Sequence, residues 1–156
     1  MLDCCFEVIL ELKKGEMMGV NNIIGPGLRA PVSTTSAKDL KVNTVVNALS
    51  HGQTIDFDKL KSIGPGYAAY VVLQGDKVIY AGSSNHLAAR FSNMMMPKTT
   101  FLLYNKLVQD LGSFRSATNF LMRDCKYRVK MCESRPDAEA VEQLTIATHN
   151  PVYNKR

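Results

Sequence analysis

Two β-rich segments joined by a short turn constrain the fold of this chain more than any other feature. Residues 67–73 and 77–81 are rich in Tyr, Val and Ala, and Gln-Gly-Asp lies between them at 74–76. β-Branched and aromatic residues favour strands, and a glycine in a short connection favours a tight reversal. The pattern therefore predicts a β-hairpin.

Three helices, a strand and a final helix are expected after the hairpin. They are predicted at residues 85–95, 101–111 and 116–124, then 125–131, then 136–149. Pro97 and Gly112 end the first two helices, while Pro136 suits the first turn of the last one. This order predicts an α+β fold with mixed α/β layers, in which helices flank a small three-stranded antiparallel sheet.

Residues 1–65 are predicted to form an N-terminal extension of unknown role, made of a strand, a loop and a helix. Alternation of side chains at 6–12 favours the strand, and a region rich in Gly, Asn and Pro follows it. Ser36 and Asp39 form a capping-box pattern at the start of a helix that reaches about Leu49. A short helical turn is expected at 56–62, and a boundary at 64–66 separates the extension from residues 66–156.

The excess of positive charge lies entirely in the second part of the chain. Residues 1–65 hold seven Lys/Arg and seven Asp/Glu, whereas residues 66–156 hold twelve and seven, which accounts for the net charge of +5. Clustered cationic side chains attract phosphates, so this half suggests a polyanionic partner such as nucleic acid. A solubilising excess of charge without a partner is the alternative interpretation.

The cysteines and the hydropathy predict a reduced, cytoplasmic protein. Cys4 and Cys5 are adjacent and cannot easily form a relaxed bridge, and Cys125 and Cys132 lack the paired short spacing of a zinc site. No apolar run is long enough to span a bilayer, so no membrane is expected. Acidic residues interrupt the first fifteen residues, which excludes a signal peptide.

Two groups of polar residues in the second half carry the chemical information. Tyr70 lies in the first hairpin strand, and Tyr80 lies ten residues later in the sequence Tyr-Ala-Gly-Ser-Ser-Asn at 80–85. Arg90 follows in the next helix, eight residues after the glycine. Glu142 lies in the last helix, and Pro-Val-Tyr-Asn follows at 151–154.

These two groups resemble the signature of GIY-YIG nucleases over about residues 66–154. The family has a Tyr, a spacer of about ten residues, Tyr-x-Gly, a Ser/Asn-containing turn and an Arg, and it closes with a Glu on a helix and a Pro-x-Tyr-Asn tail. The resemblance implies that residues 66–156 form a GIY-YIG-like domain with metal-dependent endonuclease activity on DNA. It implies no small-molecule cofactor and leaves the oligomeric state open.

The resemblance also implies a role for each matching residue. Glu142 would bind Mg²⁺ or Mn²⁺, a hard cation often held by one or two carboxylates together with waters. Arg90 would bind the scissile phosphate through its planar donor fork. Tyr70 would activate water, Tyr80 would position it, and Lys98 would assist.

Departures from the family pattern keep a second function open. The first motif reads Ala68-Ala69-Tyr70, so its glycine and branched residue are missing, and Met94 stands where many members have His or Tyr. These changes favour, as the alternative, a catalytically impaired nucleic-acid-binding module. In a third reading, the domain is structural or binds a protein partner, and residues 1–65 are the functional part.

A basic strand is the expected contact with the nucleic-acid backbone. Basic residues alternate with apolar ones over 125–131, which predicts a half-buried strand with an entirely basic exposed face. A solvated strand face without a partner is the alternative. The residues expected to contact nucleic acid are Lys126, Arg128, Lys130, Arg123 and Asn85.

Overall fold

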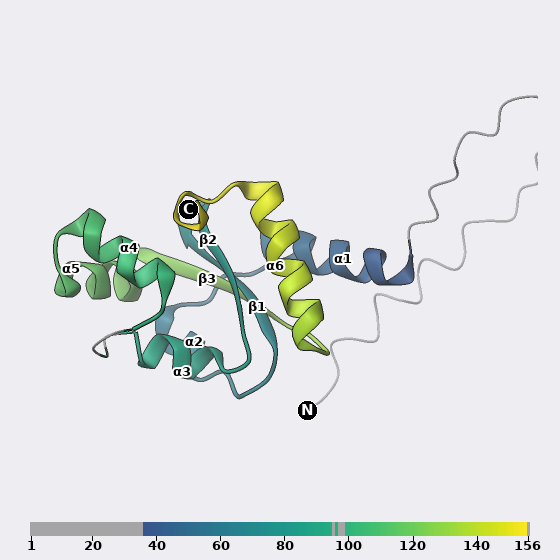
Figure 1. The fold of residues 1–156 in the computed structure, drawn as a ribbon, viewed down its shortest axis with the longest axis horizontal. Helices are drawn as coiled ribbons and strands as arrows, with labels where there is room; N and C mark the ends of the chain where they lie inside the picture. Colours follow the sequence, from purple (N-terminus) through teal and green to yellow (C-terminus); the bar gives the residue numbers. More distant parts are fainter. Residues whose placement is uncertain (1–35, 95, 97–98, 156) are drawn as a thin grey trace, which may run out of the picture. The chain divides into compact units, whose positions relative to one another are not determined.

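The computed structural model describes residues 36–94, 96 and 99–155. The chain divides into two units, Met1–Thr34 and Thr35–Arg156, and the described residues belong to the second. Its elements, shown in Figure 1, are α1 (Ala37–His51), α2 (Phe57–Lys61), β1 (Ala68–Gln74), β2 (Lys77–Ser84), α3 (Leu87–Ser92), α4 (Leu102–Leu111), α5 (Phe114–Asn119), a π-helical turn (Phe120–Asp124), β3 (Cys125–Met131), α6 (Arg135–His149) and a 3₁₀ turn (Val152–Asn154).

The sheet has three antiparallel strands in the order β2-β1-β3. The predicted hairpin forms β1 and β2, and the predicted strand at 125–131 pairs with the other side of β1. Tyr70 in β1 therefore lies between Gly82 of β2 and Val129 of β3. The predicted α+β class, with a three-stranded antiparallel sheet flanked by helices, is confirmed.

Both faces of the central strand are covered, which explains why β1 is apolar throughout. Tyr70 and Val72 face one core, to which α2, α3, α4 and α5 contribute. Val71 and Leu73 face a second core, formed with α1 and α6. Figure 1 shows these two groups of helices on either side of the sheet. Each strand residue from Ala68 to Leu73 is buried, so alternation of polar and apolar residues is absent here.

The helices before the hairpin pack in the same unit as the sheet. Ser36 caps α1 with the predicted capping box, and Val46 and Leu49 of this helix enter the second core. Asp56 caps α2, which places Phe57 in the first core. The predicted division into an N-terminal extension of unknown role at 1–65 and a domain at 66–156 stays a prediction, and the predicted strand at 6–12 lies outside the described residues.

Two helices differ from the predicted bounds for identifiable reasons. The helix predicted at 85–95 is the shorter α3, which starts at Leu87 because Ser84 and Asn85 still belong to the strand end and its turn. The helix predicted to begin at Ser116 starts two residues earlier. The Ser113 side chain accepts a hydrogen bond from the backbone N–H of Ser116 and caps α5 directly after Gly112 has ended α4 in the left-handed conformation.

Within residues 36–94, 96 and 99–155, the structure contains no helix that is both long and apolar enough to cross a membrane. Cys125 and Cys132 are free thiols, and Cys125 is buried against the first core.

Candidate active site

A polar cavity of about 350 Å³ opens beside β2, the edge strand that precedes α3. Side chains from both layers of helices reach it around this edge: Arg90 from α3, and Glu142 from α6 on the opposite face of the sheet. Tyr80 comes from β2 itself. The lining residues are Tyr67, Tyr80, Ser83, Ser84, Asn85, Arg90, Arg135, Ala138, Glu139 and Glu142.

The carboxylate of Glu142 is held against the strand. Its Oε2 accepts a hydrogen bond of 2.5 Å from the Ser83 hydroxyl, and the side chain is half-buried. Glu139, one helical turn earlier, lines the same cavity. The carboxylates and hydroxyls here are hard oxygen donors, which suit Mg²⁺ or Mn²⁺. No group of three or more His, Cys, Asp or Glu that could enclose a metal exists in the described part of the chain.

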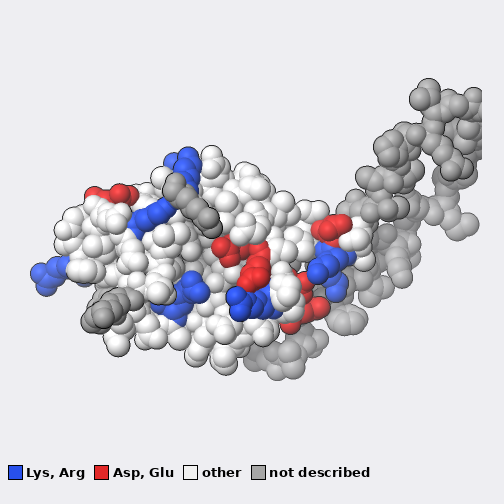
Figure 2. Space-filling view, viewed as in Figure 1, with Lys and Arg blue, Asp and Glu red and all other residues white. Residues whose placement is uncertain are grey.

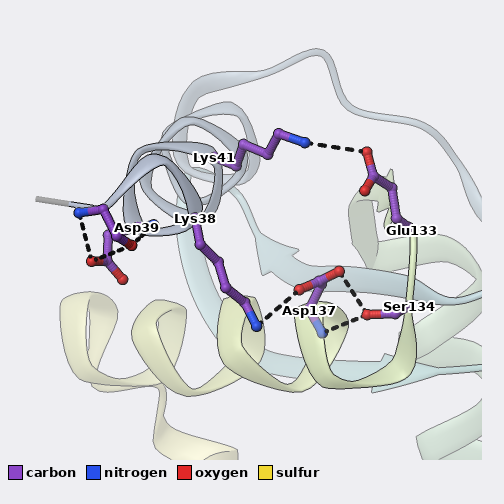
Figure 3. Close-up of polar contacts among 7 residues, drawn as sticks. Lys38, Asp39, Lys41, Glu133, Ser134 and Asp137 are labelled. Carbon is purple, nitrogen blue, oxygen red and sulfur yellow. Dashed lines mark hydrogen bonds and ion pairs between the residues drawn. The ribbon is translucent and has the colours of Figure 1, made fainter.

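Helix α6 is fixed by polar contacts around its first turn, drawn in Figure 3. Ser134 caps the helix by accepting from the Asp137 backbone N–H, and its hydroxyl donates to the Asp137 carboxylate at 2.6 Å. Lys38 and Lys41 of α1 form ion pairs of 3.7 Å with Asp137 and 3.5 Å with Glu133. These exposed ion pairs contribute little on their own. The buried face, with Val141, anchors the helix that carries Glu142.

Two tyrosine rings meet behind the cavity wall over Gly82. The rings of Tyr70 and Tyr80 lie 6.1 Å apart between centroids, inclined by 42°. A Cβ atom at Gly82 would come within 2.7 Å of the Tyr70 hydroxyl and 2.9 Å of the Tyr80 ring. Only glycine leaves room here for both phenols. The Tyr-Ala-Gly sequence at 80–82 therefore has a steric basis.

The two phenols differ in their access to the cavity. Tyr80 is 6% exposed and lines the cavity, whereas Tyr70 is 1% exposed and lies behind it in the central strand. The Tyr70 hydroxyl has no hydrogen-bond partner among the described residues. A buried hydroxyl without a protein partner costs stability.

Both phenols are protonated at neutral pH, and burial raises their pKa values further above it. It raises the pKa of Tyr70 well above its ordinary value, and the neighbouring Tyr80 raises it further, while the Arg90 cation opposes the shift. Burial also raises the pKa of Tyr80, with the Glu142 carboxylate adding to the effect and Arg90 again opposing it. Both hydroxyls are therefore hydrogen-bond donors in the protein as described.

Arg90 presents an exposed cation at the other side of the cavity. Its guanidinium lies over the Phe101 ring, 5.7 Å from the ring centroid. None of the ion pairs formed within the described residues includes Arg90. A second cavity of about 280 Å³ adjoins the first and shares Ser84, Asn85 and Arg90 with it.

The C-terminal tail closes the outer edge of the strand that carries Tyr80. The side chain of Asn154 donates to the Ala81 carbonyl and accepts from the Ala81 N–H, both at 2.8 Å. This pair satisfies backbone groups that an edge strand would otherwise expose. The Pro-Val-Tyr-Asn sequence at 151–154 thus holds the outer side of β2, whose other side pairs with β1.

Several predicted site residues lie away from the cavity. Lys126, Lys130 and Arg123 are exposed on β3 and at the end of the π-helical turn. The expectation that Arg128 would lie free on an exposed face is wrong: it is half-buried, and Nη1 donates to the carbonyls of Leu49 and Ser50 at 3.2 and 2.6 Å. Lys98 lies outside the described residues.

Six lining residues were not singled out from the sequence as functional: Tyr67, Ser83, Ser84, Arg135, Ala138 and Glu139. Ser83 stands inside the quoted motif, so its position was available. Glu139 precedes Glu142 by three residues, and this spacing places both on one helical face. Arg135 carried a weaker signal, because a basic residue at a helix start is unusual.

Known proteins that are similar to this chain include solved structures of one domain. No family model matches the chain, and no curated protein matches it. The chain is similar to crystal structures of the GIY-YIG N-terminal endonuclease domain of UvrC from Thermotoga maritima. Two point mutants bound to the catalytic divalent cation share 17% and 18% identity, cover 64% of this chain and 93% of theirs, and give TM-scores of 0.46. The magnesium-bound domain shares 18% identity over 63% of this chain and 94% of that one, with a TM-score of 0.44.

These matches concern a likeness of fold to GIY-YIG domains, the family that the sequence motifs resemble. At such low identity they concern the arrangement of strands and helices. The chemistry of this chain depends on its own side chains.

Proposed function

We propose that this protein is a metal-dependent endonuclease that hydrolyses DNA phosphodiester bonds. The observation that carries the proposal is that the Glu142 carboxylate, the Arg90 guanidinium and the Tyr80 side chain line one cavity. Phosphodiester hydrolysis requires an activated water, relief of the negative charge that develops on phosphate oxygens, and protonation of the leaving oxygen. The three groups are chemically suited to the first two tasks, and the leaving oxygen takes its proton from solvent.

Each residue has a distinct proposed task. Arg90 donates hydrogen bonds to the non-bridging oxygens of the scissile phosphate and offsets their growing charge. Glu142, oriented by Ser83, would hold Mg²⁺ or Mn²⁺. When bound, the ion supplies positive charge that stabilises negative charge on neighbouring oxygens.

The two tyrosines are assigned differently from the sequence-based expectation. Tyr80 lines the cavity and Tyr70 does not, so we assign the contact with the attacking water to Tyr80. The Tyr80 phenol first loses its proton to solvent, and the phenolate then holds this water and takes up its proton. Tyr70, packed against Tyr80 over Gly82, is a positioning residue.

The proposal includes DNA as the partner and a cytoplasmic place of action. The free thiols of Cys125 and Cys132 are in keeping with a reducing compartment. The exposed side chains of Lys126, Lys130 and Arg123 support binding to the backbone of a longer duplex.

Digestion of a plasmid panel in Mg²⁺ and in Mn²⁺ tests the proposal. The wild type is expected to produce nicked or linear DNA, a chelator is expected to stop the reaction, and Glu142→Ala and Arg90→Ala are expected to lose it. Glu133→Ala is the matched control, because Glu133 is an exposed acid that pairs with Lys41 and does not line the cavity. Cleavage by Arg90→Ala at the wild-type rate would contradict the proposed function.

One observation favours the alternative of a binding module without turnover. Met94, which replaces the His or Tyr expected from the resemblance, is 2% exposed and belongs to the first core. It therefore supplies no proton carrier at the site. Salt-sensitive DNA binding without cleavage in either metal would identify this alternative.

A further inference from the structure

We propose that Arg135 is a second phosphate-binding side chain of this cavity, and that it binds a phosphate next to the one that is cleaved. Glu139 pairs with its guanidinium until DNA displaces the carboxylate. The inference rests on the proposed function, because it extends the same site along a DNA strand.

The geometry places two guanidinium groups on one cavity from opposite layers of the fold. Arg90 comes from α3, and Arg135 is the first residue of α6. Arg135 Nε donates to Glu139 Oε1 at 2.7 Å, and both side chains are largely open to solvent, with exposed fractions of 76% and 50%. Figure 2 shows acidic and basic side chains side by side on the face that these elements present.

Helix stability does not explain an arginine at this position. The N-terminus of a helix carries partial positive charge, so a cation in the first turn is unfavourable. An ion pair with the basic residue four positions before the acid is also the less favourable orientation. Ser134 already caps the start of α6, and Asp137 already supplies a negative charge in its first turn. The arginine therefore opposes the helix dipole, which favours a role toward a ligand outside the helix.

The chemistry of the cavity fits a phosphodiester. Ser83, Ser84 and Asn85 add hydroxyl and amide groups, and Ala138 is the single aliphatic side chain among the lining residues. An arginine fork matches two phosphate oxygens. Because a DNA strand carries a phosphate at every nucleotide, a second guanidinium in the cavity meets a phosphate adjoining the one at Arg90.

The Glu139 carboxylate competes with phosphate for the Arg135 guanidinium. A solvent-exposed ion pair exchanges readily because water screens it. The carboxylate also repels an approaching phosphate. Loss of this charge should therefore strengthen DNA binding, whereas loss of Arg135 should weaken it. A purely structural ion pair would give neither pattern.

Binding of a fluorescent DNA duplex, measured by anisotropy in chelator over a range of salt concentrations, tests the inference. Arg135→Gln is expected to weaken binding about tenfold and to reduce the slope of log K against log salt by about 1. Glu139→Gln is expected to tighten binding several-fold. The matched control is Lys77→Gln, an exposed cation at the hairpin end of β2 that does not line the cavity, and a slope close to that of the wild type is expected.

The outcomes separate this inference from the proposed function. An Arg135→Gln slope equal to that of Lys77→Gln, or weaker binding by Glu139→Gln, would overturn the inference even if the wild type cleaves DNA. A wild type that binds DNA with an Arg135-dependent slope but does not cleave it in Mg²⁺ or Mn²⁺ would support the phosphate site and contradict the proposed nuclease activity. A wild type that binds no DNA at low salt overturns both. Circular dichroism of each variant confirms that it is folded.

Discussion

The Ser83 hydroxyl donates a hydrogen bond of 2.5 Å to Glu142 Oε2, which joins β2 to α6 across 59 residues of the chain. This bond fixes the orientation of the carboxylate that is proposed to hold the divalent ion. Removal of a residue that hydrogen-bonds to a metal ligand commonly lowers the metal affinity by about 10–100-fold. Ser83→Ala is therefore expected to raise the Mg²⁺ concentration for half-maximal cleavage by at least about tenfold. Ser62→Ala, whose hydroxyl bonds only to its own helix, is the control.

Gly82→Ala tests the steric basis of the tyrosine pair. The added Cβ would meet the Tyr70 hydroxyl and the Tyr80 ring at less than 3.0 Å, so the rings have to move. We expect a loss of about 1–3 kcal/mol in the free energy of unfolding and a loss of cleavage of about 10²-fold. Gly64→Ala is the control, because a Cβ there meets no atom within 4 Å. Equal behaviour of the two variants in thermal melts and cleavage assays would contradict the account.

Tyr70→Phe and Tyr80→Phe should separate the packing role of one tyrosine from the chemical role of the other. The Tyr70 hydroxyl is buried without a partner among the described residues, so its removal is expected to leave the Tm unchanged or higher. Cleavage should stay near the wild-type rate, because the Phe ring keeps the packing against the Tyr80 ring. Tyr80→Phe removes the cavity hydroxyl itself and should reduce kcat by about 10²–10⁴-fold. A Tyr70→Phe variant with lower Tm and full activity would show that the hydroxyl is structural.

The pH dependence of cleavage follows from the raised pKa of Tyr80. A phenol whose pKa lies above its ordinary value is protonated throughout the neutral range, and burial is the main cause here. The ionised fraction of such an acid grows about tenfold with each pH unit below its pKa. We expect log kcat to rise from pH 6 to pH 9 with a slope approaching +1, and Tyr80→Phe to lose this slope. A profile of equal slope in the variant would exclude Tyr80 as the proton acceptor.

The sequence predicted the hairpin, β3 and α6 well because their signals are local. A glycine turn between β-rich runs, an alternating strand and a proline in the first turn of a helix act within a few residues. These local patterns could not predict how deeply each of the two tyrosines is buried. Tyr70 is the deeper one because β3 pairs with β1 and makes it central, and that pairing depends on strand order.

Contacts between distant segments account for the remaining differences. The role of Arg128 depends on the end of α1, where the carbonyls of Leu49 and Ser50 lie within reach. The pairing of Asn154 with Ala81 likewise depends on where the tail meets the edge strand. Neither can be read from periodicity, because the partner lies more than seventy residues away.

A double-mutant cycle on Arg90 and Glu142 tests most directly whether these residues act at one site. Cleavage rates of wild type, Arg90→Ala, Glu142→Gln and the double variant are compared in saturating Mg²⁺. Residues that act as a unit are strongly non-additive, so each single change is expected to lower the rate by about 10²–10³-fold and the double change to lower it little further. Losses that multiply in the double variant, or a single variant that cleaves like the wild type, would contradict a shared catalytic site.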